Sequence, residues 1–89
     1  MKNFGVYILE SQKSGGYYIG STDNIKRRVN EHNVGKVVST RNIRLWIVRV
    51  FIECDTLTEA RSSEYRLKKY KRKDILEKVI KDKTFPWNY

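Results

Sequence analysis

The amino-terminal part of the chain alternates apolar positions in the manner of β-strands. Residues 4–9 repeat with a period of two, which places Val6 and Tyr7 on opposite faces of a strand. Residues 11–16 are polar and end in two glycines, so they are typical of a loop. An aromatic and apolar run then resumes over residues 17–20 and ends at a glycine. Two short strands around such a loop predict a β-hairpin.

The register of this hairpin decides which side chains share a face. If Leu9 pairs with Gly16, Tyr7 lies opposite Tyr18. We therefore expect both phenol rings on the same face of the sheet.

A helix and a third strand follow the hairpin. Ser, Thr and Asp precede a helix predicted from residue 24 to about residue 34, and Gly35 ends it. Residues 36–42 are expected to form a basic loop. Residues 43–53 give the strongest strand pattern, and its centre is apolar on both faces. A strand of that kind is usually covered on both sides, and we expect the same here.

The carboxyl-terminal part of the chain is predicted to be helical. Thr58 is a plausible cap for a helix that runs to about residue 71, and a third helix is expected over about residues 74–81. The tail over residues 85–89 is aromatic enough to pack back on the domain. The element order is therefore β-β-α-β-α-α. It predicts one domain over residues 1–89, of the α+β class, with a small three-stranded, mostly antiparallel sheet flanked by helices.

Composition and charge narrow the choice of partner. The 19 basic and 10 acidic residues give a net charge of +9, which favours a polyanion such as nucleic acid, although charge also serves solubility. Cys54 is the only cysteine, so neither an internal disulfide nor a cysteine metal cage is available. No apolar run is long enough to span a bilayer, and no secretion signal is evident. We expect a soluble, cytoplasmic protein that acts away from membranes.

Glu64 breaks the apolar pattern of the second helix. It shares a stripe with Ala60 and Leu67, so its carboxylate is directed inward. An inward carboxylate needs a cation, a metal ion or a hydrogen-bond partner. A buried ion pair and a functional site explain this position about equally well.

The first helix carries the opposite charge on its inward face. Arg28 and His32 share this face with Ile25 and Val29, while Glu31 is expected to point away. Arg28 has two structural alternatives, a salt bridge to the inward carboxylate of the second helix or a stem packed on a tyrosine. For a lone histidine such as His32, a structural position at the helix end, with its hydrogen bonds satisfied, is a better explanation than a functional role.

Convergence of these groups favours a functional interpretation. We expect Tyr7, Tyr18, Arg28, His32 and Glu64 to point at the same face of a small sheet. Such a set suits phosphodiester chemistry, in which a carboxylate holds a divalent ion, a guanidinium binds developing negative charge, and a tyrosine or histidine of lowered pKa takes a proton from water. A single carboxylate does not make a closed metal site, so Mg²⁺ would keep several waters and also bind substrate phosphate.

A basic run lies at the end of the second predicted helix. Residues 65–73 contain six cations and no acid, with two tyrosines interleaved. A solvated helix face is the simpler interpretation, but with this net charge we favour a strip that binds a nucleic-acid backbone.

Three ordered motifs resemble a known family. Gly-Val-Tyr at residues 5–7 and Tyr-Ile-Gly at residues 18–20 resemble the signature of the GIY-YIG nucleases. Residues 21–32 resemble the segment that carries the family's catalytic arginine, and residues 59–68 resemble the helix with its metal-binding glutamate. The resemblance covers about the whole chain. It is greatest to small bacterial stand-alone members, similar to the N-terminal nuclease module of the excision-repair protein UvrC.

The resemblance implies roles for individual residues. Tyr7 would be the general base or a water-positioning phenol, and Tyr18 would orient the nucleophile or the phosphate. Arg28, rather than its neighbour Arg27, matches the family arginine. Glu64 would be the sole protein ligand of Mg²⁺ or Mn²⁺.

Some features depart from the family pattern. Val6 replaces the isoleucine of the signature, and Asn88 is only a weak match to an asparagine that often lies near the site. No second domain that chooses a target is expected. A bare module is expected to prefer branched or single-stranded DNA, or to depend on a protein partner for specificity.

The sequence thus predicts a metal-dependent endonuclease that hydrolyses DNA phosphodiester bonds in repair or recombination. The alternative is a non-catalytic nucleic-acid-binding module that uses the basic run, and a basic ribonucleoprotein component ranks last. The candidate catalytic residues are Tyr7, Tyr18, Arg28, His32 and Glu64. The candidate nucleic-acid-binding residues are Arg27, Lys36, Arg41, Arg61, Lys68, Lys69, Lys71 and Arg72.

Overall fold

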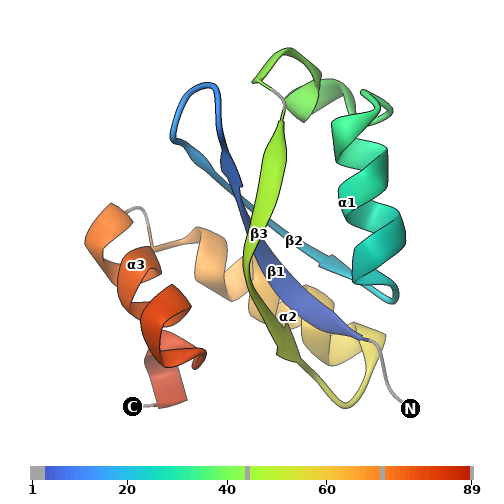
Figure 1. Ribbon diagram of the computed structural model, residues 1–89. Helices are drawn as coiled ribbons and strands as arrows, with labels where there is room; N and C mark the ends of the chain where they lie inside the picture. The colour runs from blue at the N-terminus through green and yellow to red at the C-terminus, as the bar shows by residue number, and fades with distance from the viewer. Residues whose placement is uncertain (1–3, 44, 71, 89) are drawn as a thin grey trace.

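A computed structural model describes residues 4–43, 45–70 and 72–88 of the chain (Figure 1). The elements in chain order are β1 (Gly5–Ser11), β2 (Tyr17–Thr22), α1 (Ile25–Asn33), the 3-10 segment η1 (Val38–Ile43), β3 (Trp46–Glu53), α2 (Leu57–Lys68), α3 (Lys73–Asp82) and the 3-10 turn η2 (Pro86–Asn88). Apart from the two 3-10 segments, this is the predicted β-β-α-β-α-α order. The α+β class with a three-stranded antiparallel sheet is confirmed. In the described ranges no helix has both the length and the apolar character needed to cross a membrane.

The sheet has the strand order β2-β1-β3, and both pairings are antiparallel. The predicted hairpin register is wrong by two residues, because Leu9 pairs with Tyr18 and Tyr7 pairs with Gly20. The shift is even, so both phenol rings still lie on one face. Their ring centroids are 6.4 Å apart. The second strand also continues beyond its predicted end at Gly20 to Thr22, where it pairs with the start of β1.

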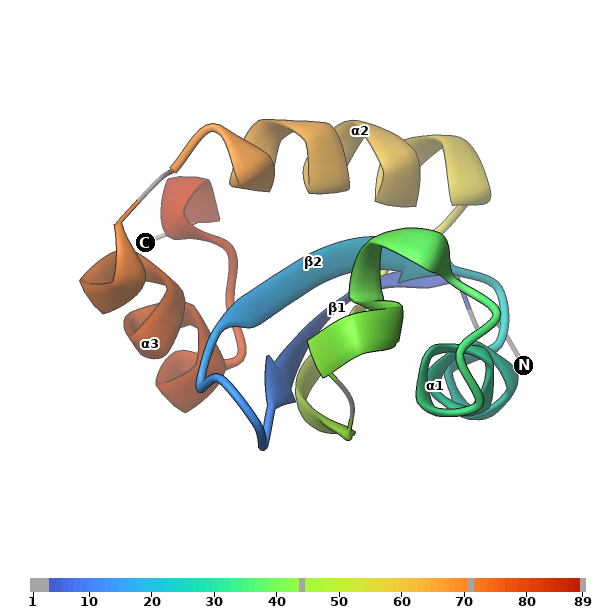
Figure 2. The ribbon, with the colours of Figure 1, turned by 90° about the horizontal axis from the view of Figure 1, so that it is seen from above.

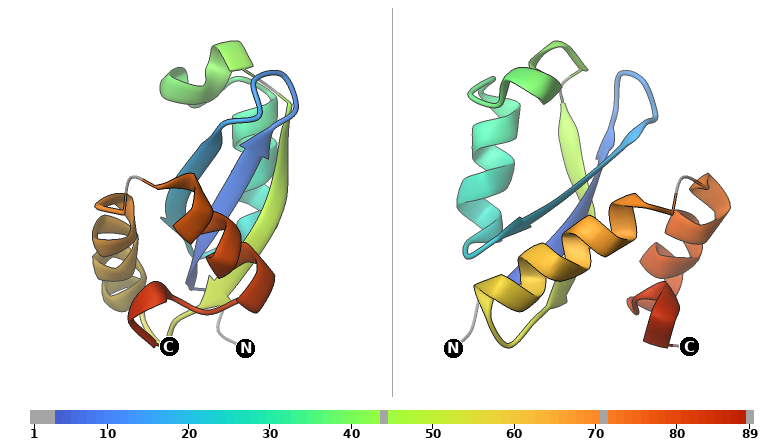
Figure 3. Two further views of the ribbon diagram at one scale, coloured as in Figure 1. Left: turned by 90° about the vertical axis from the view of Figure 1, so that its left-hand side faces the viewer. Right: turned by 180° about the vertical axis from the view of Figure 1, so that it is seen from behind.

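Each face of the sheet supports its own hydrophobic cluster. Helices α2 and α3 cover one face and α1 covers the other (Figure 2). Seen from behind, α2 runs across β1 and β2 (Figure 3). The buried members of the larger cluster are Val6, Ile8, Ile19, Val50, Cys54, Ala60, Leu67, Leu76, Val79 and Phe85. The buried members of the smaller cluster are Tyr7, Leu9 and Trp46.

The strand covered on both sides is β1, not β3 as predicted. β3 lies at the edge of the sheet, begins at Trp46 instead of residue 43, and leaves Ile47 and Val48 about 40% exposed (40% and 42%). Only Trp46 and Val50 of this strand are buried. The sequence pattern does not distinguish the two strands, because the strand that lies centrally is decided by long-range pairing.

The helix boundaries follow local capping chemistry. The Asn24 side chain accepts a hydrogen bond from the backbone N–H of Arg27, and α1 ends before Gly35, whose φ of 86° suits glycine. The expected loop over residues 36–42 instead contains η1. Thr56, not Thr58, caps α2, and this helix ends at Lys68 instead of about residue 71.

The aromatic tail packs back on the domain as expected. Phe85 is buried and stacks on Trp87 with ring centroids 4.8 Å apart. Trp87 also contacts Tyr70, which follows α2. The tail therefore closes the hydrophobic cluster beside α2 and α3.

Candidate active site

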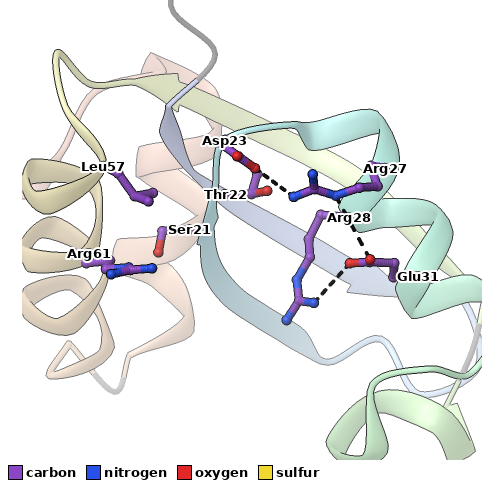
Figure 4. A pocket seen from close by; sticks show the side chains of 8 residues that line it. All are labelled: Ser21, Thr22, Asp23, Arg27, Arg28, Glu31, Leu57 and Arg61. Atoms are coloured by element: carbon purple, nitrogen blue, oxygen red, sulfur yellow. Dashed lines mark hydrogen bonds and ion pairs between the residues drawn. The ribbon is translucent and has the colours of Figure 1, made fainter.

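A polar pocket of about 280 Å³ opens between α1 and α2 at the end of β2 (Figure 4). Arg28 and Glu31 enter it from α1, and Arg61 enters it from α2. Its other lining residues are Ser21, Thr22, Asp23, Arg27 and Leu57. Three guanidinium groups around one small pocket make it suitable for an anion.

Arg28 is held in the pocket by two partners. Its Nη1 donates to the Glu31 carboxylate at 3.1 Å, and its Nε donates to the Tyr7 hydroxyl at 3.3 Å. Hydrogen bonding to Tyr7 is the main reason that the pKa of Arg28 is raised. The first structural alternative for Arg28, a salt bridge to Glu64, is wrong, because its ion pair is with Glu31. Glu31 itself faces the pocket, and the expectation that it points away is wrong.

Tyr7 lies in the centre of the sheet and is 1% exposed. Its phenol passes over Gly20 on β2, where an added Cβ would overlap the Tyr7 hydroxyl and ring. Glycine is therefore required at this position for the phenol to reach Arg28. Burial raises the pKa of Tyr7, although the Arg28 guanidinium opposes this effect. Tyr7 is accordingly a protonated phenol near neutral pH, in contrast to the lowered pKa that its predicted role requires.

His32 is fully buried behind the two tyrosines. Its Nε2 lies 3.1 Å from the Tyr7 hydroxyl, and its Nδ1 lies 2.8 Å from the Thr40 hydroxyl. Burial, assisted by the nearby Arg28 charge, lowers the pKa of His32 to about 4. The imidazole is therefore neutral near pH 7. It lies in the last turn of α1 with partners for both ring nitrogens, as expected of a satisfied helix-end histidine, and it belongs to a hydrogen-bonded chain that includes Tyr7.

Four of the five candidate catalytic residues meet on the α1 side of the sheet. The half-buried ring of Tyr18 packs edge-on against His32 at 4.9 Å and lies beside Tyr7. Glu64 comes from α2, which packs on the other face, so the expectation that all five point at one face is wrong for this residue. The site instead wraps around the free edge of β2.

Glu64 is anchored at that edge by two groups. Its Oε1 accepts a hydrogen bond from the Ser21 hydroxyl of β2 at 2.5 Å, and its Oε2 lies 2.6 Å from the Lys68 ammonium. The Glu64 side chain is 21% exposed. Lys68 in turn lies 5.9 Å from the centre of the Tyr18 ring, which links the two sides of the site.

The donor set at Glu64 fits a loosely held divalent ion. Each carboxylate oxygen has a second lone pair beyond the partner it already has, and the polar pocket begins at Ser21. Within the described ranges no group of three or more acidic, histidine or cysteine side chains gathers to enclose an ion. An ion such as Mg²⁺, which keeps several waters and favours phosphate oxygens, suits such an open site.

The predicted nucleic-acid-binding residues are dispersed. Arg27 and Arg61 line the pocket, and Lys68 pairs with Glu64. Lys36 and Arg41 are exposed beyond the carboxyl end of α1, Lys36 before η1 and Arg41 within it. Lys71 lies outside the described residues.

The basic run does not form one continuous strip, because α2 ends within it. Lys69 lies over the Tyr65 ring at 4.6 Å, and Arg72 pairs with Asp74 at 2.7 Å. Arg66 stacks on the Trp87 ring of the tail at 4.2 Å. The described cations of the basic run therefore point in several directions. Among them, Lys68 is the one that contacts candidate catalytic residues, Glu64 and Tyr18.

The structure adds three residues that the sequence interpretation missed: Ser21, Glu31 and Thr40. Ser21 lies two positions after buried Ile19 on β2 and so faces α2, a signal that alternation along the strand contains. Glu31 lies three residues after Arg28, which is the spacing of a helical ion pair. Thr40 is brought to His32 by η1, which lies where the sequence predicts a loop.

Comparison with known proteins shows which family the chain belongs to. The model of the GIY-YIG catalytic domain matches residues 3–89. The chain belongs to the GIY-YIG family. This is a family of nucleases, and its signature tyrosines in this chain are Tyr7 and Tyr18.

Relatives are found in bacteria and archaea. The chain is 38% identical to a UPF0213 protein of Bacillus licheniformis over 86% of its own length and 78% of that protein. It is also 38% identical to a UPF0213 protein of Halobacterium salinarum, over 75% of its own length and 87% of the relative. A UPF0213 protein of Bacillus cereus is 30% identical to the chain, over 89% of the chain and 82% of the relative. No solved structure matches the chain.

Proposed function

We propose that this protein is a divalent-metal-dependent endonuclease that hydrolyses DNA phosphodiester bonds at the β2 edge. The observation that carries the proposal is the position of Arg28 and Glu64. They come from helices on opposite sides of the sheet. Arg28 lines the polar pocket, and Glu64 is hydrogen-bonded to Ser21, which lines the same pocket. The ion pair with Lys68 offsets part of the repulsion between the Glu64 carboxylate and a phosphate, but a module that only binds nucleic acid does not require this carboxylate.

Arg28 is the proposed phosphate-binding group. Its guanidinium is half-buried, always charged and already oriented by Tyr7 and Glu31, so little side-chain entropy is lost when an anion enters. Negative charge increases on the phosphoryl oxygens during hydrolysis. A preoriented guanidinium stabilises that charge more than it stabilises the ground state.

Glu64 is the proposed protein ligand of Mg²⁺ or Mn²⁺. When bound, the ion would polarise a phosphate oxygen and favour a hydroxide nucleophile. Ser21, which lines the pocket, holds the carboxylate by a hydrogen bond, and Lys68 neutralises it. Both residues would keep Glu64 in position before substrate and metal arrive.

The proposed groups for proton transfer and for orienting the nucleophile are Tyr7, His32 and Tyr18. Because the pKa of Tyr7 is raised, Tyr7 accepts a proton from water only as it gives its own proton to an acceptor. His32 Nε2 is within hydrogen-bond distance of that proton. Half-buried Tyr18 is placed to orient the attacking water or the phosphate.

The biological setting follows from the same proposal. The positive charge and the polar pocket suit a DNA backbone, including branched and single-stranded forms, in repair or recombination in the cytoplasm. A protein partner is proposed to supply target specificity. Arg27, Arg61 and Lys68 are proposed to contact the DNA nearest to the scissile bond.

The test is cleavage of labelled duplex, single-stranded, flap and branched DNA with Mg²⁺, with Mn²⁺ and with EDTA. Arg28→Ala is expected to slow metal-dependent cleavage by about 100-fold or more. Lys26→Ala is the matched control, because it removes an exposed cation from the same helix outside the pocket. Tight DNA binding with no cleavage in either metal would contradict the proposal and support the non-catalytic binding module.

A further inference from the structure

A chain of four hydrogen bonds runs from the pocket into the interior of the α1 side. It links Arg28 Nε to the Tyr7 hydroxyl at 3.3 Å, and that hydroxyl to His32 Nε2 at 3.1 Å. It continues from His32 Nδ1 to the Thr40 hydroxyl at 2.8 Å, and from Thr40 to the Val37 carbonyl at 3.3 Å. Tyr7, His32 and Thr40 are each no more than 1% exposed, so water does not compete for these partners.

The direction of every bond in this chain is set by its two ends. A guanidinium is only a donor, so the Tyr7 oxygen accepts from Arg28. A backbone carbonyl is only an acceptor, so the Thr40 hydroxyl donates to Val37. The remaining bonds are then determined in turn. Tyr7 donates to His32 Nε2, and the proton of the neutral imidazole is left on Nδ1, from which it is donated to Thr40.

The opposite tautomer would leave one buried donor of this hydrogen-bonded chain without an acceptor. If Nε2 carried the proton, the Tyr7 oxygen would accept from both Arg28 and His32, and the buried phenolic proton would have no acceptor in the chain. The Thr40 hydroxyl would also have to break its hydrogen bond to the Val37 carbonyl in order to donate to His32 Nδ1. An unsatisfied buried donor costs about 1–3 kcal/mol, so the Nδ1–H tautomer is favoured.

We propose that Thr40 is a positioning residue that fixes His32 in the Nδ1–H tautomer and thereby directs the Tyr7 hydroxyl proton inward. The consequence is felt at the pocket. With its proton on the His32 side, the Tyr7 oxygen presents its lone pairs to the Arg28 side chain, which lines the pocket. This inference rests on the proposed function for its catalytic meaning, but the tautomer itself is a property of the protein without substrate.

The test uses nitrogen-15 NMR of the imidazole, which is unambiguous because His32 is the only histidine in the chain. Near pH 7 the wild type is expected to show a protonated Nδ1 and an unprotonated Nε2. Thr40→Val keeps the shape but removes the hydroxyl, and it is expected to shift the ring toward the Nε2–H tautomer. Thr40→Ser keeps the hydroxyl and is expected to preserve the wild-type pattern.

Activity supplies a second readout on the same variants. Thr40→Val is expected to lower kcat by about 10-fold with little change in KM, and Thr40→Ser is expected to restore it. A wild type with Nε2–H, or a Thr40→Val protein that folds and keeps the Nδ1–H tautomer, would overturn the inference whatever the nuclease activity. If Thr40→Val does not fold, the wild-type spectrum alone decides whether the inference holds. The expected spectra without DNA cleavage would leave the tautomer inference standing and contradict the proposed nuclease instead.

Discussion

Acidification is expected to destabilise this protein through His32 before most of its carboxylates are protonated. The imidazole is fully buried, and its pKa is lowered from 6.5 to about 4. In the unfolded chain the same group titrates near its ordinary value. Between these two pKa values the unfolded state binds a proton that the folded state does not bind. The stability that the neutral His32 imidazole contributes is therefore fully present above the pKa of the unfolded state and is lost as the pH falls toward 4.

The size of this effect follows from the pKa difference. A single group with these two pKa values lowers the free energy of unfolding by about 2 kcal/mol between pH 7 and pH 5, and by about 3 kcal/mol by pH 4. A domain of this size has a total stability of only several kcal/mol, so the loss is a large fraction of it.

Urea unfolding at a series of pH values measures the effect, with His32→Gln as the matched control. The variant keeps every acidic side chain, so subtracting its pH dependence isolates the imidazole. The wild type is expected to lose about 2 kcal/mol more than the variant between pH 7 and pH 5. Equal slopes for the two proteins, or an NMR titration of His32 with a midpoint near 6.5, would refute this account of the buried imidazole.

Three further predictions concern packing and the carboxylate. Gly20→Ala is expected to destabilise the fold by about 1–3 kcal/mol in urea, because its Cβ overlaps the phenol above it, whereas Gly16→Ala in the exposed loop should cost little; equal costs would contradict this. Leu67→Ala is expected to cost about 2–5 kcal/mol, since this side chain is 0% exposed, and a cost below 1 kcal/mol in the same assay would argue against its core position. Lys68→Met is expected to strengthen Mn²⁺ binding by about 2- to 5-fold in a paramagnetic resonance titration, because the ammonium no longer competes for Glu64. Unchanged or weaker binding would mean that Lys68 does not compete for this carboxylate.

The element order was predictable because local patterns determine it. Alternation identified β1, helical spacing identified α1 and α3, and Gly35 marked the end of a helix. The inward positions of Arg28 and Glu64 also follow from spacing alone. These features depend on neighbours within one or two turns, which a sequence contains directly.

The errors concern relations between elements. The hairpin register depends on how Tyr7 crosses over Gly20, and the position of β3 at the sheet edge depends on long-range pairing. The contribution of Thr40 depends on η1, whose path no periodic pattern records. The sequence predicts the helix that carries Glu64 but not the side of the sheet that this helix covers, so the predicted face for Glu64 is wrong. Each of these features is decided by tertiary packing, which overrides local preference.

The central claim is that Glu64 serves a metal-dependent reaction at the β2 edge. The most direct measurement is single-turnover cleavage of one labelled DNA substrate in Mn²⁺ by wild type, Glu64→Gln and Glu53→Gln, with DNA binding measured in parallel. Glu53 is the matched control, because it is an exposed carboxylate on β3 at the opposite edge of the sheet. The account predicts that Glu64→Gln abolishes cleavage while DNA binding is retained, and that Glu53→Gln cleaves like the wild type. Cleavage by Glu64→Gln at the wild-type rate, or no metal-dependent cleavage by the wild type, would contradict it.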